Sequence, residues 1–140
     1  MGDLDKKRYT RKKADETIEA LKVRLKEVNK KNFMYNVDRC VIFGSYVNTE
    51  NEYLGDLDVA IHLKIKPKYE NDEFNENCRR YEKVTGKSAY AGTVSLLKAG
   101  IFGKEEIAKF LKNKQLIISM HLIDGIQDDI IFSKKVIELM

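Results

Sequence analysis

The stretch VIFGSYVNTENEYLGDLDVAIHL, residues 41–63, decides how this chain folds. It opens with an apolar run that ends at Gly44 and Ser45, and it closes with a segment in which apolar and other residues alternate. A short apolar run closed by a turn signal is typical of a buried strand, and strict alternation is typical of a strand with two different faces. We therefore predict two strands, at 40–43 and 56–63.

The alternation in the second predicted strand separates its side chains into two faces. One face is apolar and the other carries the acids, with Leu57, Val59, Ile61 and Leu63 against Asp56, Asp58, Ala60 and His62. Because residues i and i+2 of a strand point the same way, the carboxylates of Asp56 and Asp58 are expected to converge. Two carboxylates that close repel each other, and a divalent cation relieves the repulsion. Mg²⁺ or Mn²⁺ is the expected ion, since both prefer oxygen ligands.

The Gly44–Ser45 turn supplies the second half of the expected site. A glycine lets a phosphate approach the backbone, and free N–H groups together with the Ser45 hydroxyl can hold phosphate oxygens. A metal-binding acidic pair near a phosphate-binding turn is the arrangement of metal-assisted phosphoryl or nucleotidyl transfer. An Asp-x-Asp step or a Gly-Ser pair alone is common and usually structural, so the inference depends on their combination.

The rest of the chain predicts a small mixed β-sheet flanked by about four helices, an α+β or α/β fold. Apolar residues at helical spacing from Ala14 to Val28 predict a helix over 10–31, with Thr10 as its N-cap. Other predicted elements are helices over 69–84, 89–98 and 104–113, a strand over 115–123, and either two short strands or one helix in the tail from Asp128 to Met140.

Length and composition bound the class of protein. The chain has 140 residues, 43% hydrophobic and 34% charged, which suits a single domain over 1–140, with 1–9 a flexible basic tail. No apolar run approaches the ~20 residues of a membrane span, and the N-terminal sequence lacks the apolar core of a secretory signal. The cysteines, Cys40 and Cys78, fit neither a disulfide framework nor a paired metal spacing. We expect a cytoplasmic protein with reduced thiols and no membrane contact.

Charge is unevenly distributed along the chain, whose net charge is +4. Residues 32–62 carry one Lys or Arg and five Asp or Glu, whereas the flanks are basic. The acidic middle could hold a cation, and the flanks could receive a polyanion such as a nucleoside triphosphate or RNA. A solvated surface of mixed charge is the alternative for the flanks.

The motif itself resembles that of a known family. An apolar residue, Gly44-Ser45, a spacer of ten residues and Asp56-x-Asp58 between apolar residues resemble the signature of nucleotidyltransferases of the DNA polymerase β-like superfamily. In size the chain is similar to the minimal nucleotidyltransferases, including the antitoxin partners of HEPN toxins. The specific resemblance covers residues 40–63, and the order of the predicted elements is also similar. It implies a nucleotidyltransferase-like fold.

The resemblance also implies a reaction. Gly44 and Ser45 would hold the β and γ phosphates of an NTP, with ATP as the expected donor, and Asp56 and Asp58 would bind one or two Mg²⁺ or Mn²⁺. A nucleoside monophosphate would pass to a hydroxyl of a protein, small molecule or nucleic acid, with release of pyrophosphate. A homodimer or a partner protein could complete the active cleft.

Two departures from the family pattern leave alternatives open. The third carboxylate of the family has no evident counterpart. His121 occupies the similar position, where it could act as a base or metal ligand or be a structural histidine, and Asp124 could replace the carboxylate or be a turn residue. The arginine that often follows Gly-Ser is missing. Other cations could replace it or belong instead to a solvated face: Lys64, Lys66, Lys68, Arg79 and Arg80.

These departures define the competing functions. The first is an active metal-dependent nucleotidyltransferase with Asp56, Asp58 and His121 as its catalytic residues. The second is a catalytically degenerate protein of the same fold, acting as a binding or regulatory partner as an antitoxin would. A third, weaker possibility is a nucleic-acid binder that uses the basic flanks.

Overall fold

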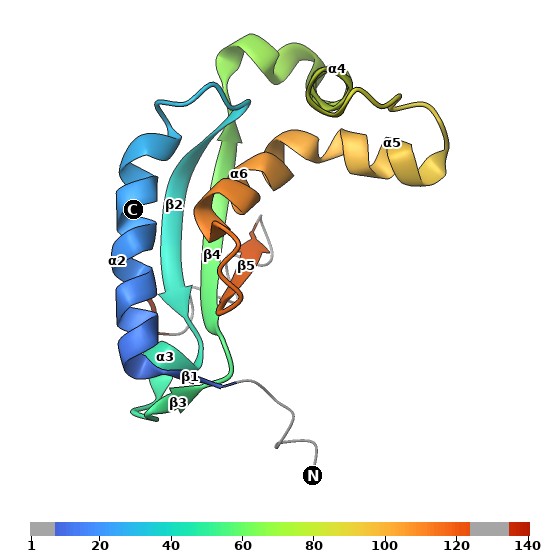
Figure 1. Cartoon of the computed structure of the whole chain (residues 1–140). Helices are drawn as coiled ribbons and strands as arrows, with labels where there is room; N and C mark the ends of the chain where they lie inside the picture. The colour runs from blue at the N-terminus through green and yellow to red at the C-terminus, as the bar shows by residue number, and fades with distance from the viewer. Residues whose placement is uncertain (1–7, 124–134) are drawn as a thin grey trace.

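The computed structural model describes residues 8–123 and 135–140, and the statements below refer to them. In chain order the elements are β1 (Tyr9–Thr10), α2 (Arg11–Val28), β2 (Tyr35–Phe43), α3 (Ser45–Asn48), β3 (Tyr53–Leu54), β4 (Leu57–Ile65), the 3₁₀ helix η1 (Pro67–Asp72), α4 (Glu73–Thr85), α5 (Thr93–Gly100), α6 (Phe102–Lys112), β5 (Ile118–Leu122) and β6 (Ile137–Glu138) (Figure 1). This mixture of helices and a small sheet confirms the predicted α+β class.

The main sheet has four strands in the order β5-β4-β2-β6. β2 runs antiparallel to both β4 and β6, whereas β4 and β5 are parallel, so the sheet is mixed as predicted. β1 and β3 form a separate antiparallel pair. The longest strands, β2 and β4, lie at the centre and bring together the two strands of the 41–63 stretch.

Helices α2 and α6 lie against one face of this sheet (Figure 1). The predicted stripe of α2 is buried there, as are the apolar residues of β4; this side of the core includes Ala14, Ile18, Leu21, Leu25, Val28, Leu57, Val59, Ile61, Ile107 and Leu111. The opposite face has a smaller cluster, formed by Val41, Ala60 and Ile123 with Phe43 and Val136 packed against it. The alternation in β4 therefore predicts its two faces correctly, and the acidic face is the one that α2 and α6 do not cover.

Both ends of α2 are fixed by side chains. The Thr10 hydroxyl accepts a hydrogen bond from the N–H of Lys13 at 3.1 Å, which is the predicted N-cap. At the other end, the Asn29 side chain accepts from the N–H of Val37 at 2.7 Å and donates to its carbonyl at 2.9 Å. Asn29 thus ties the end of α2 to β2.

β2 begins five residues before the predicted strand over 40–43. The register against β4 shifts between Val37 and Arg39, as a β-bulge does. The bulge lets Val37 and Cys40, three positions apart, both reach the core on the α2 side. The period of two is broken, so the alternation rule misses the first half of the strand.

Other boundaries also differ from the prediction. Tyr9 pairs with Leu54, so the predicted tail over 1–9 is wrong at Tyr9, and residues 1–7 lie outside the described residues. Asp56 precedes β4 instead of belonging to it. Of the tail, Ile137–Glu138 forms a strand, and Ile130 to Phe132 lie outside the described residues.

The segment from α4 to α5, residues 73–100, extends away from the sheet, and we call it the helical arm (Figure 1). Its own small core contains Cys78, Tyr81, Ala89 and Ala99. Cys78 and Cys40 are both buried free thiols, and burial raises the pKa of the Cys40 thiol to about 12. No helix in the described part of the chain has both the length and the apolar character needed to cross a membrane.

The central packing gives a stability prediction. Ile61 is fully buried in β4, so Ile61→Ala should cost about 2–5 kcal/mol through lost burial and a residual cavity. Val23 on α2 is 58% exposed, and Val23→Ala should change stability by less than about 0.5 kcal/mol. Urea unfolding followed by circular dichroism compares the two variants. Equal losses would contradict this account of the core.

Candidate active site

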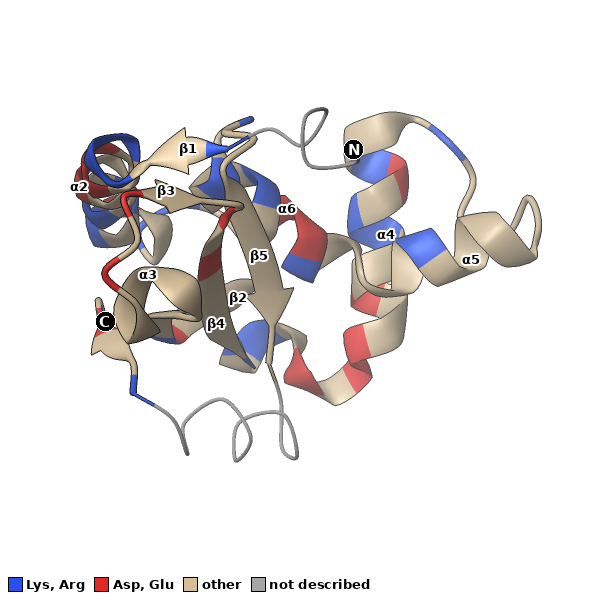
Figure 2. Ribbon diagram, turned by 90° about the horizontal axis from the view of Figure 1, so that it is seen from below, with Lys and Arg blue, Asp and Glu red and all other residues tan. Residues whose placement is uncertain are grey.

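The two predicted motifs meet at one end of the sheet, where β2 ends and β4 begins. Phe43, the last residue of β2, pairs with Asp58 across the antiparallel ladder, and Gly44 follows directly. Figure 2 views the molecule from this end, with α3 beside the start of β4 and β5 on its other side. The register therefore places the Gly-Ser turn next to the second aspartate of the Asp-x-Asp step.

Gly44 needs to be a glycine for two reasons. Its backbone has φ 81° and ψ −151°, a region that side chains rarely tolerate. In addition, a Cβ placed on Gly44 would collide with Oδ2 of Asp58 and would lie 3.3 Å from its Cγ. The backbone of the turn and the Asp58 carboxylate are thus in direct contact.

The residues after Gly44 form a single closed turn, α3. The N–H groups of Val47 and Asn48 donate to the Gly44 carbonyl at 3.1 Å and 3.0 Å, and the Thr49 hydroxyl donates to the Ser45 carbonyl at 2.7 Å. The first N–H groups of a helical turn have no acceptor within the turn, so they are suited to hold an anion. The predicted phosphate-binding role of Gly44 and Ser45 is compatible with this geometry.

Arg11, the first residue of α2, binds the loop that follows Gly-Ser. Its guanidinium donates to the carbonyls of Tyr46, Thr49 and Asn51 at 2.9, 3.0 and 3.1 Å, and it lies 4.8 Å from the centre of the Tyr46 ring. The Tyr46 hydroxyl also donates to Asp15 on α2. Sequence reasoning missed this positioning role, because Arg11 looks like one member of a basic segment and its acceptors are backbone atoms far along the chain.

The two predicted metal ligands lie at the start of β4. Asp58 is on the sheet face away from α2 and α6, and its side chain is 22% exposed. Burial raises the pKa of the Asp58 carboxyl, the negative charge of Asp56 raises it further, and His121 opposes both effects. The two carboxylates therefore interact unfavourably.

β5 brings His121 to the same place. Asp58 pairs with Ser119 and Ala60 with His121, so Ser119 and His121 share the face of Asp58. The Nε2 atom of His121 lies 3.2 Å from Oδ1 of Asp58 and 3.2 Å from the Ser119 hydroxyl, and its ring packs edge-on against Phe43. Ser119 was missed by the sequence analysis, although the i, i+2 rule applied to the Asp-x-Asp step would also pair it with His121.

The donor set suits a hard divalent ion. Within residues 8–123 and 135–140 no group of three or more His, Cys, Asp or Glu side chains is arranged to hold a metal, and Asp124 lies outside these ranges. Among the described residues, the carboxylates at the site are those of Asp56 and Asp58. Mg²⁺ commonly takes one or two carboxylates and completes its shell with water and substrate phosphates, so two are enough.

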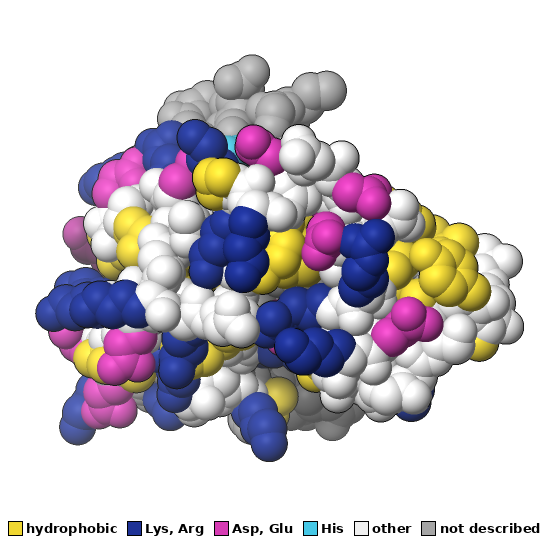
Figure 3. Space-filling model, turned by 90° about the horizontal axis from the view of Figure 1, so that it is seen from above, with side chains coloured by type: hydrophobic (Ala, Val, Ile, Leu, Met, Phe, Trp, Pro, Cys, Tyr) yellow, Lys and Arg dark blue, Asp and Glu magenta, His cyan; other side chains and the backbone are white. Residues whose placement is uncertain are grey.

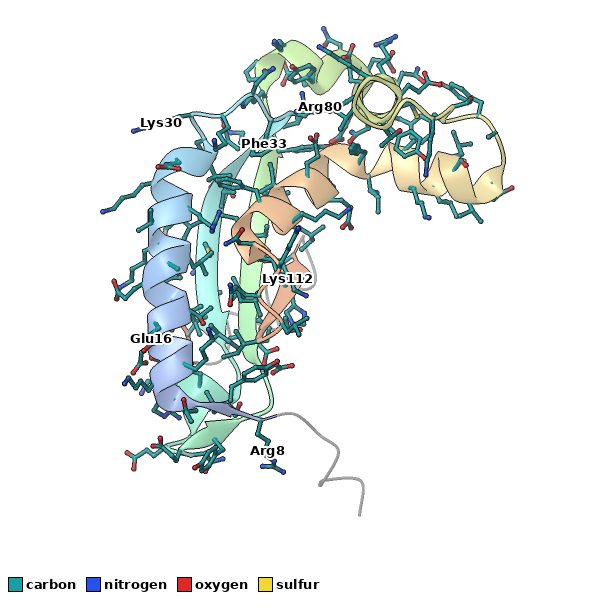
Figure 4. All side chains as sticks on the ribbon, viewed as in Figure 1. Arg8, Glu16, Lys30, Phe33, Arg80 and Lys112 are labelled. Carbon is teal, nitrogen blue, oxygen red and sulfur yellow. The ribbon has the colours of Figure 1, made fainter. Side chains whose placement is uncertain are left out.

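The five basic residues proposed to replace the missing arginine lie elsewhere. Lys64 is six residues beyond Asp58 on β4, about 20 Å along the strand, and the others follow it. Arg80, labelled in Figure 4, lies at this far end and binds Glu106 on α6. Arg79 forms an ion pair with Glu76, which is also a residue of α4. The strand carries these cations away from the Gly-Ser turn, so they are not placed to replace the arginine.

Comparison with known families agrees with this geometry. A family model for the nucleotidyltransferase domain matches residues 21–138. The chain belongs to the nucleotidyltransferase domain family. The match runs from α2 to β6 and includes the Gly-Ser turn and the Asp-x-Asp step, which confirms the resemblance seen in residues 40–63. Family membership supports nucleotidyl transfer as the general activity and an NTP as the donor. Comparisons with curated proteins and with solved structures gave no match.

The contact between Gly44 and Asp58 predicts that Gly44→Ala destabilises the protein more than the same substitution at Gly86. Gly86 also has a positive φ, 72°, but a Cβ there meets no atom within 4 Å. Gly86→Ala should therefore cost only about 1–2 kcal/mol of backbone strain, whereas Gly44→Ala adds a collision with Asp58 and should cost more. Thermal unfolding of both variants tests this, and an equal cost would show that the contact with Asp58 has no consequence.

Asp58 also predicts a dependence of stability on pH. Because its folded pKa lies above the ordinary 3.8, ionisation penalises the folded state as the pH rises through the folded pKa, and the penalty persists at pH 7. Asp58→Asn removes the penalty. We expect the variant to melt above the wild type at pH 7, with the difference shrinking as the pH falls toward 3.8.

The measurement is thermal unfolding at several pH values between about 3.5 and 7. Glu50→Gln, which removes an exposed carboxylate, serves as the control and should melt like the wild type throughout. A lower melting temperature of Asp58→Asn at pH 7 would contradict the unfavourable environment described for this carboxylate.

Proposed function

We propose that this protein is a metal-dependent nucleotidyltransferase that moves a nucleoside monophosphate from an NTP, with ATP as the expected donor, to an acceptor hydroxyl. The observation that carries the proposal is the place of the Asp58 carboxylate, held between the Gly44 backbone and Nε2 of His121. A metal ligand, a phosphate-binding turn and a proton acceptor are the three parts that such a transfer needs.

Asp56 and Asp58 would hold Mg²⁺ or Mn²⁺. Their mutual repulsion and the burial of Asp58 raise its pKa, and a bound cation would reverse this balance in favour of the ionised carboxylates. When bound, the ion would supply charge neutralisation and polarisation of the α-phosphate. The chain's own contribution is to hold both acids at the start of one strand.

Gly44 and Ser45 would hold the β and γ phosphates. The absence of a side chain at Gly44 lets the Asp58 carboxylate lie against the turn. The Ser45 hydroxyl and the first N–H groups of α3 can donate to phosphate oxygens. Arg11 would contribute indirectly, because its three hydrogen bonds fix the loop from Tyr46 to Asn51. It is a positioning residue in this proposal.

His121 would take the proton of the acceptor. Its side chain is 42% exposed, and because Nε2 faces the acceptor-only carboxylate of Asp58, Nδ1 is the ring nitrogen left to take a proton from an acceptor hydroxyl. The acceptor oxygen bonds to the α-phosphorus, the bond from that phosphorus to the bridging oxygen breaks, pyrophosphate leaves, and the proton moves to the ring nitrogen of His121 that does not donate to Asp58. This assigns to a histidine the task of the missing third carboxylate.

The acceptor is proposed only as a hydroxyl of a protein, a small molecule or a nucleic acid. A homodimer or a partner chain would complete the half-exposed site. The proposed location is the cytoplasm, where NTP is plentiful and the free thiols Cys40 and Cys78 stay reduced.

Transfer of label from α-³²P-NTP in the presence of Mg²⁺ or Mn²⁺ tests the proposal. Asp56→Asn and Asp58→Asn should each reduce transfer at least about 100-fold, because each removes a charge that binds the metal. The same ions should raise the melting temperature of the wild type and not that of Asp58→Asn. Asp38→Asn, an exposed aspartate on β2, is the matched control and should keep activity and the metal response.

The outcomes separate the competing functions. Equal transfer by the wild type and both aspartate variants would reject the assignment of these residues. Tight binding of ATP and Mg²⁺ in calorimetry, without turnover on any acceptor class, would instead support the degenerate binding protein. His121→Gln should lower transfer, whereas His62→Gln, at a histidine paired with Asp38, should not.

A further inference from the structure

We propose that the helical arm carries a docking site for an acidic amphipathic helix of a partner protein. The site consists of an exposed apolar stripe on α5 and an adjoining groove between α4, α5 and α6. This inference is independent of nucleotidyl transfer and concerns the opposite end of the molecule.

The stripe is the first observation. Val94, Leu97 and Ile101 follow one another at steps of three and four, and they are 65%, 68% and 47% exposed. The other side of α5 is apolar too, since Leu96 and Ala99 pack into the small core with Tyr81. A helix with apolar residues on two sides normally has both covered, so α5 has one apolar face that lacks a cover within the described residues. Figure 3 shows hydrophobic side chains gathered at the arm.

The groove continues this stripe. Lys98 of α5 and Ile101, the residue between α5 and α6, line it together with Tyr81 and Val84 of α4 and Phe102 of α6, and its volume is about 710 Å³. Phe33 closes it on the side of the sheet and packs against Phe110 of α6 with ring centres 5.7 Å apart (Figure 4). An aromatic groove continuous with an exposed stripe offers a longer surface than a small ligand needs, and it suits the apolar face of a helix.

Charge decides which helix fits. Glu106 at the groove is bound by Arg80 and is therefore neutralised. Lys98 and Lys109 also line the groove, and within the described ranges neither has an ion pair; Glu105 is the opposing acid. Lys98 is moreover the one charged residue of α5. A partner with acidic residues beside its apolar stripe would complement these lysines.

A second copy of this chain fits less well. In a symmetric dimer the same patch of both copies would meet, so Lys98 and Lys109 of both copies would gather around one apolar contact. Like charges facing each other across an apolar contact are unfavourable. The charge pattern therefore favours a different protein over self-association.

The docking site and the candidate active site are well separated. The arm begins after the end of β4, whereas Asp58 lies near the start of that strand (Figure 1). Nine residues of extended chain span about 30 Å. A helix bound to the arm would leave the Gly-Ser turn and His121 open.

The test uses the full chain and a labelled helical peptide as the probe. The peptide carries leucines at i, i+3 and i+7 and glutamates on both flanks, and its binding is followed by fluorescence anisotropy. We expect the wild type to bind it, and Leu97→Ser to weaken binding at least tenfold. Leu116→Ser is the matched control, because Leu116 is equally exposed at 72% but lies outside the arm.

A charge exchange tests the acidic character of the partner. Lys98→Glu should weaken binding of the glutamate-flanked peptide and strengthen binding of a peptide with lysine flanks. Lys12→Glu on α2 should change the binding of neither peptide. No binding of the acidic peptide up to roughly 100 µM, equal binding of a scrambled peptide, or equal losses in Leu97→Ser and Leu116→Ser would each overturn the proposal. A dimer in sedimentation velocity that Leu97→Ser dissociates would overturn it in favour of a second copy.

Discussion

The contact between the Gly44 backbone and the Asp58 carboxylate is the constraint on which the site depends. It exists because β2 and β4 pair in one register, with Phe43 opposite Asp58. A shift of one residue would turn the apolar face of β4 away from α2 and α6, so burial of Leu57, Val59 and Ile61 fixes the register. The hydrophobic core thereby sets the distance between the Gly-Ser turn and the Asp58 carboxylate.

The same contact has an electrostatic cost. Asp58 sits in a partly buried place beside a second carboxylate, which raises its pKa, and the turn next to it holds a backbone conformation reserved for glycine. Neither feature helps folding. In the proposed function both features become useful, since Asp58 would bind a cation and the turn an anionic substrate, and stability is commonly exchanged for function in this way.

Surrounding structure holds this unfavourable arrangement in place. Arg11 binds three carbonyls of the loop after Gly44, so the loop cannot relax away from the carboxylate without losing charge-assisted hydrogen bonds. On the other side, His121 contacts Asp58 and packs against Phe43. The site is thus supported from α2 and from β5, two elements that come from distant parts of the chain.

Local patterns in the sequence were sufficient for part of this picture. The faces of β4, the stripe and N-cap of α2 and the Gly-Ser and Asp-x-Asp motifs follow from short-range rules. The first half of β2 did not, because its bulge breaks the alternation. The role of Arg11 could not be predicted, because its partners are carbonyls of Tyr46, Thr49 and Asn51, and every residue carries a carbonyl.

The misplaced cations show a different limit. Lys64 and Lys66 were considered near the motif because they are close in sequence, but an extended strand carries each residue about 3.3 Å further from its start. The predicted strand over 56–63 already implied that residues after it lie far from Asp56 and Asp58. The parallel pairing of β4 with β5 did not follow from the sequence, and neither did the alignment of Ser119 with Asp58.

The parts of the site are joined by connections of very different length along the chain. Gly44, Asp56 and Asp58 lie within one antiparallel pair whose connection is short, whereas β5 reaches β4 only after a crossover through η1, α4, α5 and α6. Parallel neighbours always require such a crossover, and closing a longer loop costs more conformational entropy. His121 therefore joins its partners at an entropic expense that the two aspartates do not bear, and the strength with which the intervening helices dock governs how firmly the histidine is held.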